Sequence, residues 1–117
     1  MLVKNSLISI VAIFLLNGIC FAEDLKIDDL YGTWQITRED GSNPLNWDEF
    51  YRFKRDGTVD YTGNDNSRNY RFELKGQEII IHRGAVTLNR LVKEYSENRI
   101  VVFDTFAEMI FIYTRIK

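Results

Sequence analysis

The sequence predicts an all-β fold: an eight-stranded antiparallel up-and-down barrel preceded by a short leader turn. Turn-forming residues recur roughly every eight to twelve positions, and β-branched and aromatic residues fill the intervals between them. Several segments alternate strictly, as where Tyr70, Phe72 and Leu74 interleave with Arg71 and Glu73. Alternation through successive strands indicates a sheet wrapped around one core, and closure of that sheet removes exposed edges. A small open sheet or a sandwich is the alternative.

The first 22 residues have the order of charges and apolar residues that is typical of a secretory signal peptide. Lys4 precedes an apolar run over residues 7–16, and Cys20 and Ala22 occupy the small-residue positions before a cut at Glu23. The run is too short to span a bilayer, which takes about 20 residues. We therefore expect residues 1–22 to be removed, leaving a domain of residues 23–117 in the periplasm or outside the cell, without a transmembrane segment.

Cys20 raises a minority alternative, in which the chain is cut before this cysteine and anchored through a lipid on it. The residue before a lipidated cysteine is normally small, whereas here it is Ile19. The sequence therefore favours removal of Cys20 with the signal peptide.

The composition of the remaining chain excludes several classes of protein. Removal of 22 residues leaves 117 − 22 = 95, enough for one domain, and this portion has no cysteine with which to form a disulfide. It keeps 14 basic and 17 acidic residues, so its net charge is 14 − 17 = −3. This mild acidity argues against nucleic acid or an anionic membrane surface as the main partner. We expect a monomer without a cofactor.

The predicted strands follow one another through short turns, as an antiparallel meander requires. Asp56-Gly57 is the strongest hairpin signal, and residues 63–68 are expected to form a loop. In the leader, Leu25, Ile27 and Leu30 are expected to share one side of a helical turn. The strands are expected at residues 31–38, 49–55, 58–62, 69–74, 78–82, 86–95, 99–104 and 108–116.

A glycine and a tryptophan stand two positions apart at the start of the first strand, in Gly32-Thr33-Trp34, and an arginine, Arg115, lies late in the last strand. This combination resembles the signature of the lipocalins and, more broadly, of calycin-type barrels. The resemblance implies that Trp34 plugs the closed end of the barrel and that Arg115 packs across its indole. Gly32, which has no Cβ, would let the leader backbone cross close to the barrel. Short strands with many large inward residues predict little empty space inside.

The sequence offers no catalytic or metal-binding constellation, and we expect the protein not to be an enzyme. His82 is the only histidine, and it stands at the end of a strand, where a hydrogen-bonded or solvated side chain is expected. One histidine and no remaining cysteine exclude a usual zinc site. The oxygen-rich segment 63–69 resembles a calcium loop in composition, but it has one carboxylate and turn-forming residues, which favour a plain turn.

The leading hypothesis is a non-enzymatic binding protein that takes a small apolar or amphipathic ligand, or a protein partner, at the open end of the barrel. Trp47 in the first loop, with Phe50 and Phe106, supplies aromatic contacts, and Arg90, if it points inward, supplies a cation for a carboxylate. The alternative is an inhibitor or immunity-type protein that blocks a secreted enzyme with an exposed loop such as residues 61–69.

Overall fold

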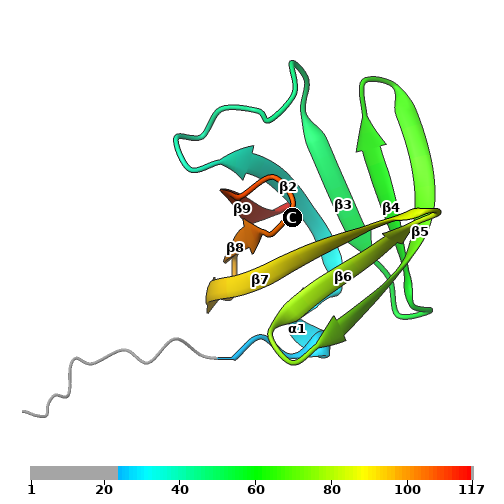
Figure 1. Cartoon of the computed structure of the whole chain (residues 1–117), viewed down its shortest axis with the longest axis vertical. Coiled ribbons are helices and arrows are strands. Elements are labelled where there is room, and N and C mark those ends of the chain that lie inside the picture. The colour runs from blue at the N-terminus through cyan, green and yellow to red at the C-terminus, as the bar shows by residue number, and fades with distance from the viewer. Residues whose placement is uncertain (1–23, 117) are drawn as a thin grey trace, which may run out of the picture.

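A computed structural model describes residues 24–116, which form a closed barrel of eight antiparallel strands (Figure 1). Each strand pairs with the next along the chain, and the last pairs with the first. The strands are β2 (Gly32–Arg38), β3 (Glu49–Phe53), β4 (Thr58–Gly63), β5 (Asn66–Lys75), β6 (Glu78–Arg83), β7 (Val86–Ser96), β8 (Arg99–Asp104) and β9 (Met109–Ile116), preceded by the short helix α1 (Ile27–Leu30). The predicted fold class is confirmed. The signal peptide and Cys20 predictions lie outside the described residues.

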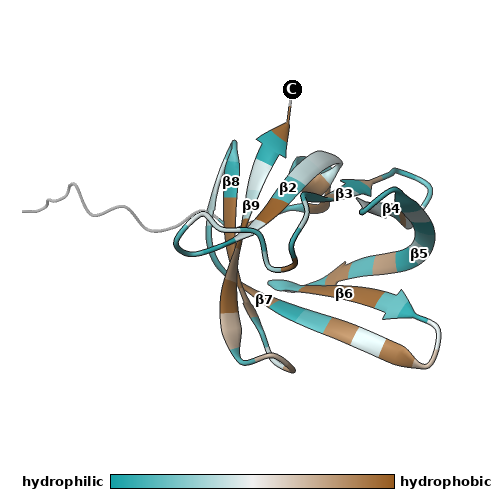
Figure 2. Cartoon of the chain, turned by 90° about the horizontal axis from the view of Figure 1, so that it is seen from above, coloured by the Kyte–Doolittle hydropathy of each residue, from teal (hydrophilic) through white to brown (hydrophobic). Residues whose placement is uncertain are grey.

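The barrel encloses one core, because alternate residues of each strand point inward. In β8, Ile100 and Val102 are fully buried and Arg99 is exposed, and Figure 2 shows the same mixture of hydrophilic and hydrophobic residues along the other strands. The two ends of the barrel differ. Helix α1 lies at one end with the β3–β4, β5–β6 and β7–β8 turns, and the β2–β3 loop and β4–β5 hairpin lie at the other (Figure 1).

The α1 end is closed by Trp34, whose side chain is completely buried. Its Nε1 donates a hydrogen bond to the Leu30 carbonyl at 2.8 Å. The Arg115 guanidinium lies 4.1 Å from the centre of the indole ring and donates to the carbonyls of Tyr31 and Asp29 at 3.0 and 2.6 Å. The pairing of Trp34 with Arg115 that the resemblance implies is therefore present.

Gly32 is required where the leader enters the barrel. Its φ of +123° lies in a region that other residues rarely adopt, and a Cβ at this position would lie 2.9 Å from Arg115 Nη1. A side chain at position 32 would therefore strain the backbone and displace the arginine that covers Trp34.

The leader is attached by contacts that the sequence predicts only in part. Leu25 and Leu30 are buried and Ile27 is 38% exposed, and because Leu25 precedes the helix, the three residues do not share one side of a helical turn. The Gln77 side chain accepts a hydrogen bond from the Leu25 amide at 2.9 Å and donates one to the Leu25 carbonyl at 3.0 Å. One amide side chain of the β5–β6 turn thus holds the leader as a neighbouring strand would.

The main error in the predicted strands concerns residues 63–68, which were expected to form a loop. The structure has a two-residue turn at Asn64 and Asp65, whose φ values are 48° and 62°, and β5 begins immediately afterwards. Asparagine and aspartate tolerate this left-handed conformation, which a tight hairpin requires at both turn positions. The hairpin therefore remains paired up to its tip, with Gly63 opposite Asn66.

The Asp56-Gly57 hairpin is present, but its loop is longer than two residues. The Lys54 amide donates to the Thr58 carbonyl, which leaves three residues between this pair, and Gly57 has a φ of 87°. A type I turn followed by a left-handed residue is the usual form of such a loop.

Candidate binding site at the open end of the barrel

The open end, opposite α1, is formed by the β2–β3, β4–β5, β6–β7 and β8–β9 connections. It brings together three of the four residues predicted to bind a ligand. Trp47 lies in the β2–β3 loop, Phe106 in the β8–β9 loop, and Arg90 inside the barrel on β7. Phe50 belongs to the opposite face of β3, because its neighbours Tyr51 and Glu49 occupy the inward positions. The alternation of Tyr51 and Phe53 in the sequence already contains this signal.

Arg90 points inward, as expected for a regular strand, because the bulge in β7 comes later, between Val92 and Glu94. Its side chain is buried, with a relative exposure of 7%. Its Nε donates to Asp104 Oδ2 at 2.8 Å and its Nη1 to the Tyr113 hydroxyl at 3.0 Å. The guanidinium also lies 4.7 Å from the centre of the Phe111 ring. Arg90 was expected to bind the carboxylate of a ligand, but it binds the carboxylate of Asp104 instead.

Asp104 joins this buried pair to the β8–β9 loop. Its Oδ1 accepts hydrogen bonds from the amides of Phe106 and Ala107 at 2.9 and 2.7 Å, and its carbonyl accepts one from the Glu108 amide. Burial alone would raise the pKa of the Asp104 carboxyl, but the bonds from Ala107 and Arg90 outweigh it and lower the pKa below its usual value. The loop is therefore held by an ionised carboxylate at its base.

Phe106 is the most exposed large apolar side chain of the described chain, at 87%. The next two are Val86, at 58% the first residue of β7, and Leu45, at 45% in the β2–β3 loop, and both belong to the same end. Exposed apolar residues scattered singly are ordinary, whereas residues gathered at one end of a barrel are typical of a contact surface. We call Leu45, Val86 and Phe106 the apolar rim.

Trp47 folds against the barrel instead of projecting from it. It is half-buried, and its Nε1 makes a long hydrogen bond of 3.5 Å to the Tyr61 hydroxyl, which donates to Glu49 Oε2 at 2.8 Å. A Cβ on Gly63 would lie 2.5 Å from that hydroxyl and 2.9 Å from Trp47 Nε1. The absence of a side chain at Gly63 is therefore what allows Trp47 and Tyr61 to meet at the rim.

The interior below the rim is filled by aromatic side chains. The ring of Tyr51 lies 5.9 Å from that of Phe53 and 6.1 Å from that of Tyr113, and Phe53 lies 4.9 Å from Phe72. An open hollow of about 280 Å³ lies at the surface where β2 ends and β9 begins, lined by Arg38, Glu39, Asp40, Met109 and Ile110. A ligand at this end would therefore contact the rim and the hollow instead of entering the barrel.

The buried tyrosines predict a loss of stability at alkaline pH. Burial raises the pKa values of Tyr51, Tyr61 and Tyr113, and for Tyr51 and Tyr113 it outweighs the opposing effect of Arg90. Their contribution is fully present below the unfolded pKa of about 10 and is lost as pH rises towards the folded values. We expect the denaturant midpoint to fall above about pH 10, with delayed tyrosinate absorbance at 295 nm. The prediction would be contradicted if all tyrosines of the folded protein ionised together near their ordinary pKa of about 10.

Catalytic and metal-binding groups are sparse in the part of the chain that the structure describes. His82 Nε2 lies 2.9 Å from Glu73 Oε2 on the outside of the barrel. Among residues 24–116 no group of three or more histidine, cysteine, aspartate or glutamate side chains is placed to hold a metal ion. No helix in the same range is both long and apolar enough to cross a membrane.

Sequence reasoning missed Glu49, Val86 and Asp104 at the open end, and it included Tyr61 and Gly63 only within the 61–69 segment of the inhibitor alternative. Of these, Asp104 carried the clearest signal, because an aspartate at the end of a strand commonly accepts hydrogen bonds from the following turn amides. No protein-family model matches the chain, and comparisons with curated proteins and with solved structures find no significant match.

Proposed function

We propose that this chain is a non-enzymatic binding protein, exported to the periplasm or the cell exterior, that recognises its target with the open end of the barrel. The observation that carries the proposal is Phe106, an 87% exposed aromatic side chain on a turn whose amides are held by the buried Asp104. Rigid aromatic anchors dominate the affinity of many interfaces because little ordering entropy is lost on binding.

A protein partner, or a ligand held at the rim, is favoured over a small molecule enclosed in the barrel. The rings of Tyr51, Phe53 and Tyr113 occupy the space that an enclosed ligand would need. A small apolar or amphipathic ligand lying across the apolar rim is the second form of the same proposal, since Leu45, Val86 and Phe106 surround this end.

Inhibition of a secreted enzyme is the alternative function, and it gains one specific observation. The segment from Tyr61 to Asn69 is a hairpin paired to its two-residue tip. A rigid hairpin can enter an enzyme cleft at a small entropic cost. In this case the hairpin tip at Asn64 and Asp65, and not the Phe106 turn, would carry the contact.

The test is native mass spectrometry of the protein purified from the cells that naturally produce it, as wild type and as Phe106→Ser, Asn64→Ala and Ile27→Ser variants. We expect a bound molecule or partner of fixed stoichiometry in the wild type and in Ile27→Ser, which changes an exposed apolar residue at the closed end. Phe106→Ser is expected to weaken binding about 30-fold, as removal of an interface anchor does.

Each outcome has a distinct meaning. A retained small molecule supports the ligand form, and a protein of fixed stoichiometry supports the partner form. Loss of binding in Asn64→Ala but not in Phe106→Ser would favour the inhibitor alternative. A wild-type barrel without any companion, or binding that none of the open-end variants weakens, would contradict the proposal.

A further inference from the structure

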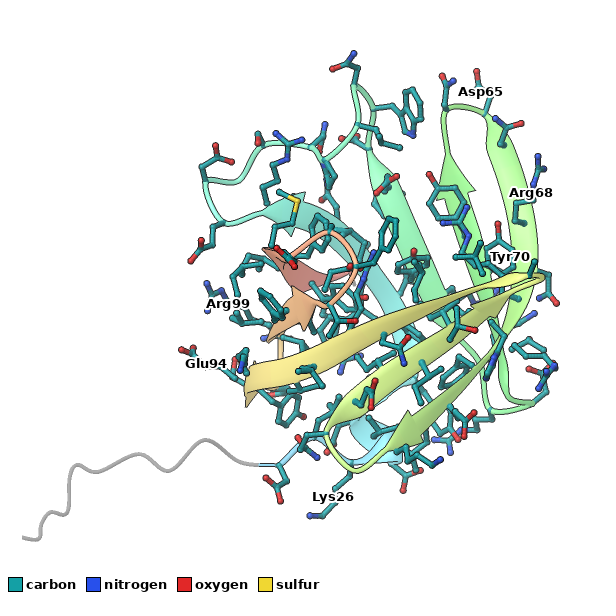
Figure 3. All side chains as sticks on the ribbon, viewed as in Figure 1. Lys26, Asp65, Arg68, Tyr70, Glu94 and Arg99 are labelled. Carbon is teal, nitrogen blue, oxygen red and sulfur yellow. The ribbon has the colours of Figure 1, made fainter. Side chains whose placement is uncertain are left out.

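Arg68 and Arg83 lie at the open end, and within residues 24–116 neither forms an ion pair, although the protein as a whole is acidic. Arg68 pairs with Tyr61 of β4, so the two side chains lie on the same face of the sheet. Tyr70, two positions after Arg68 on β5, lies on that face as well (Figure 3). The Arg83 guanidinium, at the end of β6, lies 5.4 Å from the centre of the Tyr70 ring. Arg68 and Arg83 thus flank one tyrosine on one face of the sheet.

The acids on this face are already engaged. Glu49 accepts the Tyr61 hydroxyl, and Asp104 holds Arg90 and the Phe106 turn. Among the described residues, no carboxylate lies within ion-pair distance of Arg68 or Arg83.

The acids of the surrounding loops form no ion pair with these arginines. Asp40 accepts hydrogen bonds from Ser42, and Asp48 accepts one from Asn43, both within the β2–β3 loop. Asp65 lies at the tip of the β4–β5 hairpin (Figure 3). None of the carboxylates named above forms an ion pair with Arg68 or Arg83, so neither guanidinium is in direct contact with an acid.

An apolar side chain lies directly opposite one of these cations, Arg83. Val86, the second most exposed member of the apolar rim, pairs with Arg83 across the β6–β7 turn. A guanidinium binds carboxylate, sulfonate or phosphate oxygens through directed donors, and stacking on an aromatic ring holds it in place. The combination of an exposed cation, a phenol and an apolar side chain fits an anionic group attached to an apolar body.

We propose that the open end recognises an amphipathic anion, with Arg83 and Arg68 binding the anionic group and Val86 and Phe106 contacting the apolar part. This inference rests on the proposed function and specifies its ligand chemistry. Its two sources are a small molecule such as a long-chain carboxylate and an acidic, aromatic segment of a protein partner.

The test compares two fluorescent probes of similar shape: 8-anilinonaphthalene-1-sulfonate, which is anionic, and N-phenyl-1-naphthylamine, which is neutral. We expect Arg83→Gln to weaken the anionic probe about tenfold, because a charge-assisted hydrogen bond is lost, and to leave the neutral probe unchanged. Added salt should weaken only the anionic probe. The matched control is Arg71→Gln, an exposed arginine on the opposite face of β5, paired with the outward His82. Near-ultraviolet circular dichroism confirms that each variant is folded.

Phe106→Ser separates this inference from the proposed function, since it should weaken both probes. Suppose that Phe106→Ser weakens the binding of both probes while Arg83→Gln and Arg71→Gln have equal effects on the anionic probe. The open end then binds apolar molecules, but its preference for anions is refuted. If Phe106→Ser changes neither probe, the open end is not the binding site and both proposals fail.

Displacement of the anionic probe by dodecanoate would indicate a small-molecule ligand, and displacement by an N-acetylated Phe-Glu amide would indicate an acidic protein segment. Failure of both to displace it would overturn the inference.

Discussion

Replacement of Arg90 by methionine is expected to lower the free energy of unfolding by about 3 to 5 kcal/mol, the range found when one partner of a buried ion pair is removed. Methionine fills much of the arginine volume, so the loss comes mainly from Asp104, which stays buried without its cation. The measurement is the urea or guanidinium unfolding curve at pH 7.

Two comparisons show whether the buried charge is the cause. Below about pH 4 the unpaired carboxylate becomes protonated, so the deficit of Arg90→Met should shrink. The control is Arg99→Ala, which removes an exposed arginine lying 3.8 Å from Glu94 on the outside of the barrel and should cost less than about 1 kcal/mol. A loss below about 1 kcal/mol for Arg90→Met would mean that the pair contributes no more than an exposed one.

Truncation of Trp34 to alanine should cost about 3 to 5 kcal/mol, as for other fully buried aromatic side chains. The variant loses the packing of the closed end, the hydrogen bond to the Leu30 carbonyl and the surface on which Arg115 lies. Equilibrium denaturation followed by far-ultraviolet circular dichroism measures the loss.

Trp47→Ala is the natural comparison, because it removes the same side chain from a half-buried position with one long hydrogen bond. We expect it to cost clearly less than Trp34→Ala. A loss under about 1 kcal/mol for Trp34→Ala would show that the barrel does not depend on its plug. Because the chain has two tryptophans, each variant also assigns the fluorescence of the other.

The candidate site could be predicted only in outline. Trp47, Arg90 and Phe106 were identified as residue types suited to binding, and the fold places all three at the open end or just below it. Their roles differ from those expected. Arg90 is neutralised by Asp104, and Trp47 is held against the barrel by Tyr61. A role depends on which side chain lies opposite, and register between strands is a property of the assembled sheet.

The sequence by itself determined the fold class, the approximate strands and the closed end. These follow from local properties: the two-residue period of a half-buried strand, the turn preferences of glycine, asparagine and aspartate, and a glycine placed before Trp34. Only the tertiary structure decided that Asp104 pairs with Arg90, that Asp104 holds the turn on which Phe106 is exposed, and that Arg68 and Arg83 form no ion pair within residues 24–116. These facts arise from contacts between separate strands, which barrel closure creates and which no local pattern specifies.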